Sequence, residues 1–126
     1  MEFTSRKLAD VVVAAPSGAI DHPNAMKVQQ ALAPFIEEEA AGRAPLVLDF
    51  SAVDYISSMG LRVLMMASKA MRARNVAMGI AGLQPSVAEI FDIARFRLVI
   101  DTFPTVRDAL AAVSPAAASA YDAASA

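Results

Sequence analysis

The sequence contains no cysteine, no tryptophan and a single histidine among its 126 residues. Because cysteine is absent, the chain can form neither a disulfide framework nor a thiolate nucleophile, and its composition suits a reducing cytoplasm. A structural zinc site needs several histidine or cysteine ligands, which one histidine cannot supply. These absences argue against disulfide, thiol and zinc chemistry, and we expect a protein that needs no metal or cofactor.

Neither a strong charge of one sign nor a long hydrophobic run is present. The 11 Lys and Arg residues nearly balance the 13 Asp and Glu residues, for a formal net charge of −2. Such a chain has no overall basic field that would attract nucleic acid or an acidic membrane. No apolar run approaches the roughly 20 residues of a membrane-spanning helix, and MEFTSRKLAD lacks the apolar core of a signal peptide. We therefore expect a cytoplasmic protein that binds no nucleic acid and does not insert into a membrane.

Short apolar runs mark the predicted strands. Three consecutive valines indicate a strand over residues 8–14, which a turn at Pro16-Ser17-Gly18 would end. A weaker pattern indicates an earlier strand at residues 3–7. Later strands are predicted from the runs PLVLDF, VAMGIAG and FRLVI.

Apolar residues at helical spacing predict the helices between these strands. The first helix would begin with Asn24 as its cap, run to about Ala41 and stop at Gly42. A second would run from about Ser58 to Arg74. The later helices are predicted in QPSVAEIFDIA and in TVRDALAAV, the last with Pro104 near its first turn.

This alternation of strands and helices with short connections predicts a single α/β domain. We expect one mixed sheet of four to five strands, with helices packed mainly on one face. The domain would span residues 1–113. The Ala/Ser-rich segment 114–126, SPAAASAYDAASA, is predicted to be a loosely attached tail.

Two adjacent serines, Ser57 and Ser58, stand where the segment DFSAVDYISSMGLRVLMM changes from strand and loop to helix. One interpretation is a helix cap, although both serines cannot cap the same helix. A catalytic nucleophile is a second, but it needs a base, and only His22 is available; the G-x-S-x-G pattern is also missing. In the third, a partner enzyme phosphorylates the serine, since a helix N-terminus accepts a phosphate whose charge would repel a partner surface.

The stretch VLDFSAVDYISSMGLRVL resembles the strand–loop–helix signature of STAS domains, specifically of anti-sigma-factor antagonists. Upstream, SGAIDHPNA is similar to the Gly-x-Leu-Asp loop of that family. Downstream, VAMGIAGLQPSVAEIFDIARFRLVIDTFPTVRDAL is similar to its remaining strands and helices. The resemblance covers roughly residues 8–113, in the family's order and spacing.

The resemblance implies a regulatory binding module that is not an enzyme. Gly60 matches the signature glycine, so Ser58 inherits the phosphoacceptor position, and Asp21 matches the loop aspartate. The implied partner is an anti-sigma factor with serine kinase activity, released from its sigma factor on binding; a serine phosphatase would reverse the phosphorylation. The alternative is a constitutive STAS subunit of a larger assembly, such as a lipid-transporting ABC complex. The expected partner-binding residues are Asp21, His22, Ser57, Ser58, Met59, Arg62, Met66 and Lys69.

A helical wheel of the segment after Ser58 shows two apolar faces. One face is expected to pack on the sheet; its members are Leu61, Leu64, Met65 and Ser68. The opposite face holds Met59, Met66 and Ala70, flanked by Arg62 and Lys69. Neighbouring helices could cover these methionines, or the methionines could form an adaptable surface for a partner.

Overall fold

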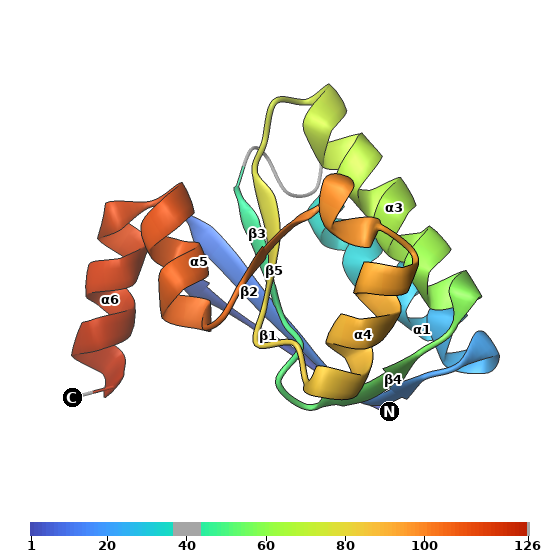
Figure 1. The fold of residues 1–126 in the computed structure, drawn as a ribbon. Coiled ribbons are helices and arrows are strands. Elements are labelled where there is room, and N and C mark those ends of the chain that lie inside the picture. Colours follow the sequence, from blue (N-terminus) through green and yellow to red (C-terminus); the bar gives the residue numbers. More distant parts are fainter. Residues whose placement is uncertain (37–43, 126) are drawn as a thin grey trace.

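The computed structural model describes residues 1–36 and 44–125, and within them one mixed sheet forms the centre of the fold (Figure 1). Five strands lie in the order β1-β2-β3-β5-β6, and β4 pairs with the far end of β2. The bounds are β1 Glu2–Leu8, β2 Val11–Ile20, β3 Leu46–Asp49, β4 Val53–Ile56, β5 Met78–Ala81 and β6 Asp101–Phe103. β1 and β2 form an antiparallel hairpin, and the other pairings are parallel.

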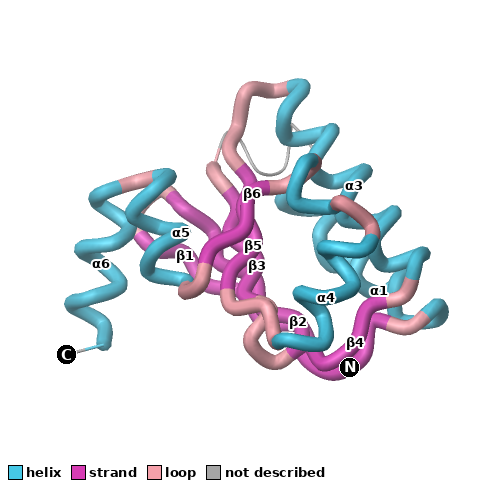
Figure 2. The backbone as a smooth tube through the Cα atoms, viewed as in Figure 1, coloured by secondary structure: helices cyan, strands magenta, loops and turns pink. Residues whose placement is uncertain are grey.

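Helices cover both faces of this sheet (Figure 2). One face carries α1 His22–Ile36, α3 Ser58–Ala73, α4 Pro85–Ile93 and the 3₁₀ turn η1 Phe96–Leu98. The other face carries α5 Val106–Val113 and α6 Pro115–Ser125. Because β3 is buried between the two helical layers, its sequence is a continuous apolar run rather than an alternating one.

The predicted fold class is confirmed, with differences in the details. The sheet has six strands within the described residues, one more than the upper expectation, because VDYI forms β4. Only Val53 and Ile56 are buried in this strand, so it lacks the apolar run by which the other strands were predicted. The helices are divided between the faces, since α5 and α6 pack opposite α1, α3 and α4.

The predicted turn at Pro16-Ser17-Gly18 is wrong, because β2 continues through it to Ile20. The parallel neighbour of β2 changes at this point: β3 pairs as far as Ala14, and β4 begins to pair at Gly18. The amides of Val12 and Gly18 both donate toward the side of β2 on which β3 and β4 lie. Because backbone groups alternate in direction along a strand, the nitrogen of Pro16 faces the same side. The missing N–H of this proline therefore falls between two partners and costs no ladder hydrogen bond.

The predicted strand FRLVI is also wrong, because η1 occupies its first part and the strand is β6. Arg95 adopts a left-handed conformation, with φ at 54°, and turns the chain out of α4. The ring of Phe96 then packs edge-on against that of Phe91, with ring centroids 5.1 Å apart. Phe96 and Ile100 thus fill the core beside α4, and the more polar edge strand follows them.

One further expectation about the helices needs correction. Asn24 lies inside α1, and the carboxylate of Asp21 accepts a hydrogen bond from the Asn24 amide at 3.0 Å, as a cap does. The predicted end of this helix, at Ala41 and Gly42, lies outside the described residues. The helices predicted from about residue 58 and in QPSVAEIFDIA and TVRDALAAV are present as α3, α4 and α5.

The expectation that the C-terminal segment is loosely attached is wrong, because residues 115–125 form α6, with Ala117 and Ala118 buried against the second core. The small alanine side chains allow this helix to approach α5 and the sheet closely. A two-oxygen hydrogen bond from Arg107 to Asp122 joins α5 to α6 and raises the pKa of Arg107 above its usual value.

Candidate functional site

The candidate site lies where β2 and β4 end and the helices α1 and α3 begin. The last residues of the two strands, Ile20 and Ile56, are paired in register. The amide of Ser57 donates to the carbonyl of Ile20 at 2.8 Å. This hydrogen bond brings the Asp21 loop and the serine pair together, although they are far apart in the sequence.

The two serines have different roles in the local structure. The hydroxyl of Ser57 accepts a hydrogen bond from the amide of Gly60 at 3.1 Å, so Ser57 is the cap of α3. Ser58 is the first residue of the helix and is exposed. Its hydroxyl makes no hydrogen bond to any residue that the structure describes. The helix is therefore capped by one serine while the other presents a free hydroxyl to solvent.

Gly60 lets α3 start this close to the strands. A Cβ atom added to it would lie 2.7 Å from Cγ1 of Ile56 and 2.9 Å from Cγ2 of Ile20. Both contacts are shorter than side-chain atoms tolerate, and both isoleucines are buried. The glycine thus sets the position of the first turn of α3, and with it that of Ser58.

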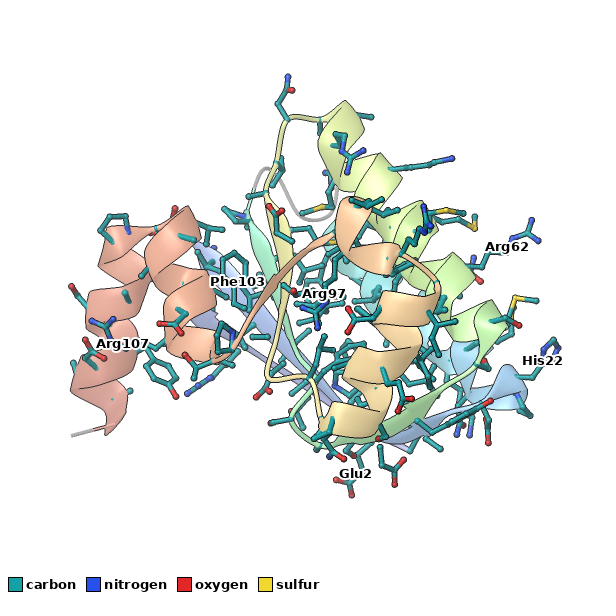
Figure 3. All side chains as sticks on the ribbon, in the orientation of Figure 1. Glu2, His22, Arg62, Arg97, Phe103 and Arg107 are labelled. Atoms are coloured by element: carbon teal, nitrogen blue, oxygen red, sulfur yellow. The ribbon has the colours of Figure 1, made fainter. Side chains whose placement is uncertain are left out.

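The start of α1 completes this end of the molecule. Asp21 is half-buried and occupied as the cap of α1, and Asn24 donates its side-chain amide to the carbonyl of Ala19 at 2.9 Å. His22 is exposed and extends outward from the start of α1, as Arg62 does from α3 (Figure 3). In the described part of the chain, no hydrogen bond joins His22 to Ser58. The described residues also hold no cluster of three or more metal-ligating side chains.

The packing of α3 separates the two apolar faces seen in the sequence. Leu64 and Ser68 are buried as expected, whereas Leu61 and Met65 are only half-buried. The fully buried face is shifted toward Val63, Ala67 and Met71, because α3 packs against α1 as well as the sheet. The remaining exposed α3 residues of the predicted set are Arg62, Met66 and Lys69, while Met59 is half-buried.

A shallow apolar groove of about 180 Å³ runs between α1 and α3. Its lining residues are Gln29, Leu32, Ile36, Val63, Met66, Ala67 and Ala70. Helix α1 therefore covers part of the methionine face, yet Met66 remains 50% exposed. The neighbouring helix α1 thus accounts for part of this face, because it lines one groove together with Met66 and Ala70. The role of Met66 in binding a partner stays a prediction.

Two exposed apolar residues on the elements that meet at the site are not among the residues predicted from the sequence. Met26 in α1 is 53% exposed, and Tyr55 in β4 is 47% exposed. Met26 lies outside the apolar periodicity of its helix, and that departure could have identified it. Tyr55 stands three residues before Ser58 in a segment interpreted as a loop, so no signal marked it. We define the Ser58 surface as His22, Met26, Tyr55, Ser58, Arg62 and Met66.

None of the helices in the described residues is long and apolar enough to cross a membrane. The elements that meet at the site, α1, β4 and α3, thus present the hydroxyl of Ser58 together with exposed methionine, aromatic and basic side chains. This combination suits contact with another protein, because methionine adapts to different surfaces and tyrosine anchors interfaces.

The chain is similar to known proteins. A protein-family model described as the STAS domain matches residues 2–109. BtrV of Bordetella bronchiseptica, which carries the provisional name of anti-sigma factor antagonist, is 32% identical over 114 residues, covering 90% of this chain and 93% of BtrV.

Solved structures show the same fold. An anti-sigma factor antagonist from Mycobacterium paratuberculosis is 28% identical, with a TM-score of 0.75 over 89% of this chain and 94% of that one. A protein of Thermotoga maritima with the same provisional name has a TM-score of 0.79 at 20% identity, over 88% and 93% of the two chains.

Proposed function

This chain belongs to the STAS domain family, and we propose that it acts in the cytoplasm as an anti-sigma factor antagonist. In this role it binds an anti-sigma factor through the Ser58 surface and so frees a sigma factor for transcription. Support comes from the names of the relatives of 28% and 32% identity. The proposed function is binding rather than catalysis, as the names of these relatives imply.

We further propose that phosphorylation of Ser58 switches this binding off. The observation that carries this proposal is the division between the two serines: Ser57 caps α3, so the hydroxyl of Ser58 is exposed and can enter a kinase active site. Ser58 also stands at a helix N-terminus, where N–H groups and the helix dipole favour a phosphate. The fold can therefore accept the modification with little change.

The effect of the phosphate would fall on the partner. About two negative charges would be buried or repelled at the interface. A poorly paired buried charge costs about 2–5 kcal/mol, which corresponds to roughly 30-fold to several-thousand-fold in affinity. An anti-sigma factor with kinase activity would therefore release itself from this chain by phosphorylating Ser58. A phosphatase that removes the phosphate would restore binding.

The test uses the anti-sigma factor kinase encoded in the same genome. After incubation with this kinase and ATP, mass spectrometry should find phosphate on Ser58 in the native chain and in Ser57→Ala. Titration by calorimetry should show that Ser58→Ala binds the kinase like the unmodified chain, whereas phosphorylated chain and Ser58→Asp bind weakly. Phosphate on Ser57 alone, or unchanged affinity after modification of Ser58, would refute the switch and favour a constitutive subunit.

A further inference from the structure

Strand β1 forms one edge of the sheet and, among the described residues, pairs only with β2. It has seven residues, against three in the strand at the other edge, β6. Four consecutive residues, from Thr4 to Lys7, are exposed. An edge of this length presents a row of unpaired backbone donors and acceptors that another strand can use.

The pairing with β2 determines which backbone groups face outward. The amide of Val12 donates to the carbonyl of Pro45, on the side away from β1. The odd-numbered residues of β2 therefore face β1, and their partners in register are Glu2, Thr4, Arg6 and Leu8. The N–H and C=O groups of the alternate residues, Phe3, Ser5 and Lys7, are consequently directed outward.

A second copy of the same strand can use these groups. Along an antiparallel ladder, a residue whose backbone groups face the partner strand lies opposite a residue of the same kind. A two-fold axis between two identical strands must therefore place one residue opposite its own copy. Three registers place the axis at the middle residue of β1 or next to it, with Thr4, Ser5 or Arg6 opposite its own copy. The register centred on Arg6 is disfavoured, because it places two like charges opposite each other.

Charge favours the register centred on Thr4. In that register Glu2 lies opposite the second copy's Arg6, and Arg6 opposite the second copy's Glu2. These are non-hydrogen-bonded positions, where facing side chains are closest and opposite charges stabilise the pair. In the register centred on Ser5, Glu2 would face Leu8 and Arg6 would face Thr4, so no charges would be matched.

The side chains are already placed for these contacts. Every second side chain of β1 lies on the same face of the sheet, namely those of Glu2, Thr4, Arg6 and Leu8. Leu8 packs on this face in the core beneath α5 and α6. The guanidinium of Arg6 lies 5.4 Å from the centroid of the Tyr121 ring in α6, a contact that holds it on this face. Glu2 extends away from the sheet near the start of β1 (Figure 3).

We propose that two copies of this chain associate through β1, antiparallel and with Thr4 at the two-fold axis, so that their sheets become continuous. The charges on β1, which would discourage pairing with an arbitrary strand, here select the chain's own copy. A single short strand forms a small contact, so the dimer is weak and depends on concentration. The proposal does not rest on phosphorylation, because Ser58 lies on α3, across the sheet from the proposed charge pairs.

The absence of cysteine from the chain allows a test with single-cysteine variants. In Thr4→Cys the two Cα atoms at the axis would be about 4.5 Å apart, within the range of a disulfide. Ser5→Cys is the matched control, because its two copies would be displaced by about 7 Å along the strands. After mild oxidation at high protein concentration, Thr4→Cys should give about tenfold more disulfide-linked dimer than Ser5→Cys.

Charge reversal tests the same register without cysteine. In sedimentation experiments up to millimolar concentration, the native chain should dimerise, and Arg6→Glu or Glu2→Arg should weaken the dimer by about tenfold. The combined variant Glu2→Arg with Arg6→Glu should recover it, and thermal melting should show that each variant is folded. A native chain that stays monomeric, equal oxidation of the two cysteine variants, preferential oxidation of Ser5→Cys or no recovery in the combined variant would overturn the proposal.

Discussion

The amide of Ser57 donates a 2.8 Å hydrogen bond to the carbonyl oxygen of Ile20, which joins the start of α3 to the end of β2. This contact places the serine pair beside the Asp21 loop, where α1 begins. It uses only backbone atoms, so the side chains on this surface can be changed without losing the arrangement.

The two serines should respond differently to alanine. Ser57→Ala removes the acceptor for the Gly60 amide and should lower the free energy of unfolding by about 1 kcal/mol. Ser58→Ala removes a hydroxyl that bonds to no described residue and should change it by less than about 0.5 kcal/mol. Urea denaturation of both variants makes the comparison. An equal loss in both would mean that Ser58 also contributes to the cap.

Gly60→Ala should destabilise the fold by more than about 1 kcal/mol, because the new methyl group meets the side chains of Ile56 and Ile20. The control is the double variant with Ile56→Ala, which removes the closest obstructing atom. Its loss should be smaller than the sum of the two single losses, by about 0.5 kcal/mol or more. Additive losses in urea denaturation would show that the contact with Ile56 does not limit this position.

The exposed apolar residues of the Ser58 surface should contribute to binding. Tyr55→Ala and Met66→Ala should each weaken binding of the anti-sigma factor by about 1 kcal/mol or more, while leaving the free energy of unfolding nearly unchanged. Leu98→Ala is the matched control, since Leu98 is 82% exposed but lies on η1, away from this surface. Calorimetric titration of the three variants measures the difference. A larger loss in Leu98→Ala would place the interface near η1 instead.

The attachment of α6 should depend on Ser114. Its hydroxyl donates to Asp10 at 2.7 Å and accepts from the Ala117 amide at 3.2 Å, in a buried position. Ser114→Ala should therefore cost about 1–3 kcal/mol in free energy of unfolding. Ser119→Ala, at an exposed position in the same helix, should cost less than about 0.5 kcal/mol. Similar melting temperatures for the two variants would contradict the role given to Ser114.

Local patterns were sufficient for the elements that have a strong pattern of their own. The apolar run of β3 and the helical spacing in α3 and α5 identified these elements. The family signature around Gly60 likewise identified the start of α3. Where a pattern was weak, tertiary contacts decided: VDYI became β4 because the far end of β2 lacked a partner there, and the Ala/Ser-rich segment became α6 because an apolar face of the sheet was free to bury it.

The sequence alone thus determined that the chain is an α/β domain with a serine pair at a helix start, since these features depend on periodicity and on residues close together in the chain. Only the tertiary structure decided that Ser57 caps α3, that Tyr55 and Met26 are exposed, and that Glu2 and Arg6 lie on a strand at a free edge of the sheet. The start of α3, the burial of side chains and the pairing of β1 depend on contacts between residues distant in sequence, such as that of Ile20 with Ser57. Such contacts arise from packing, and local residue patterns do not specify them.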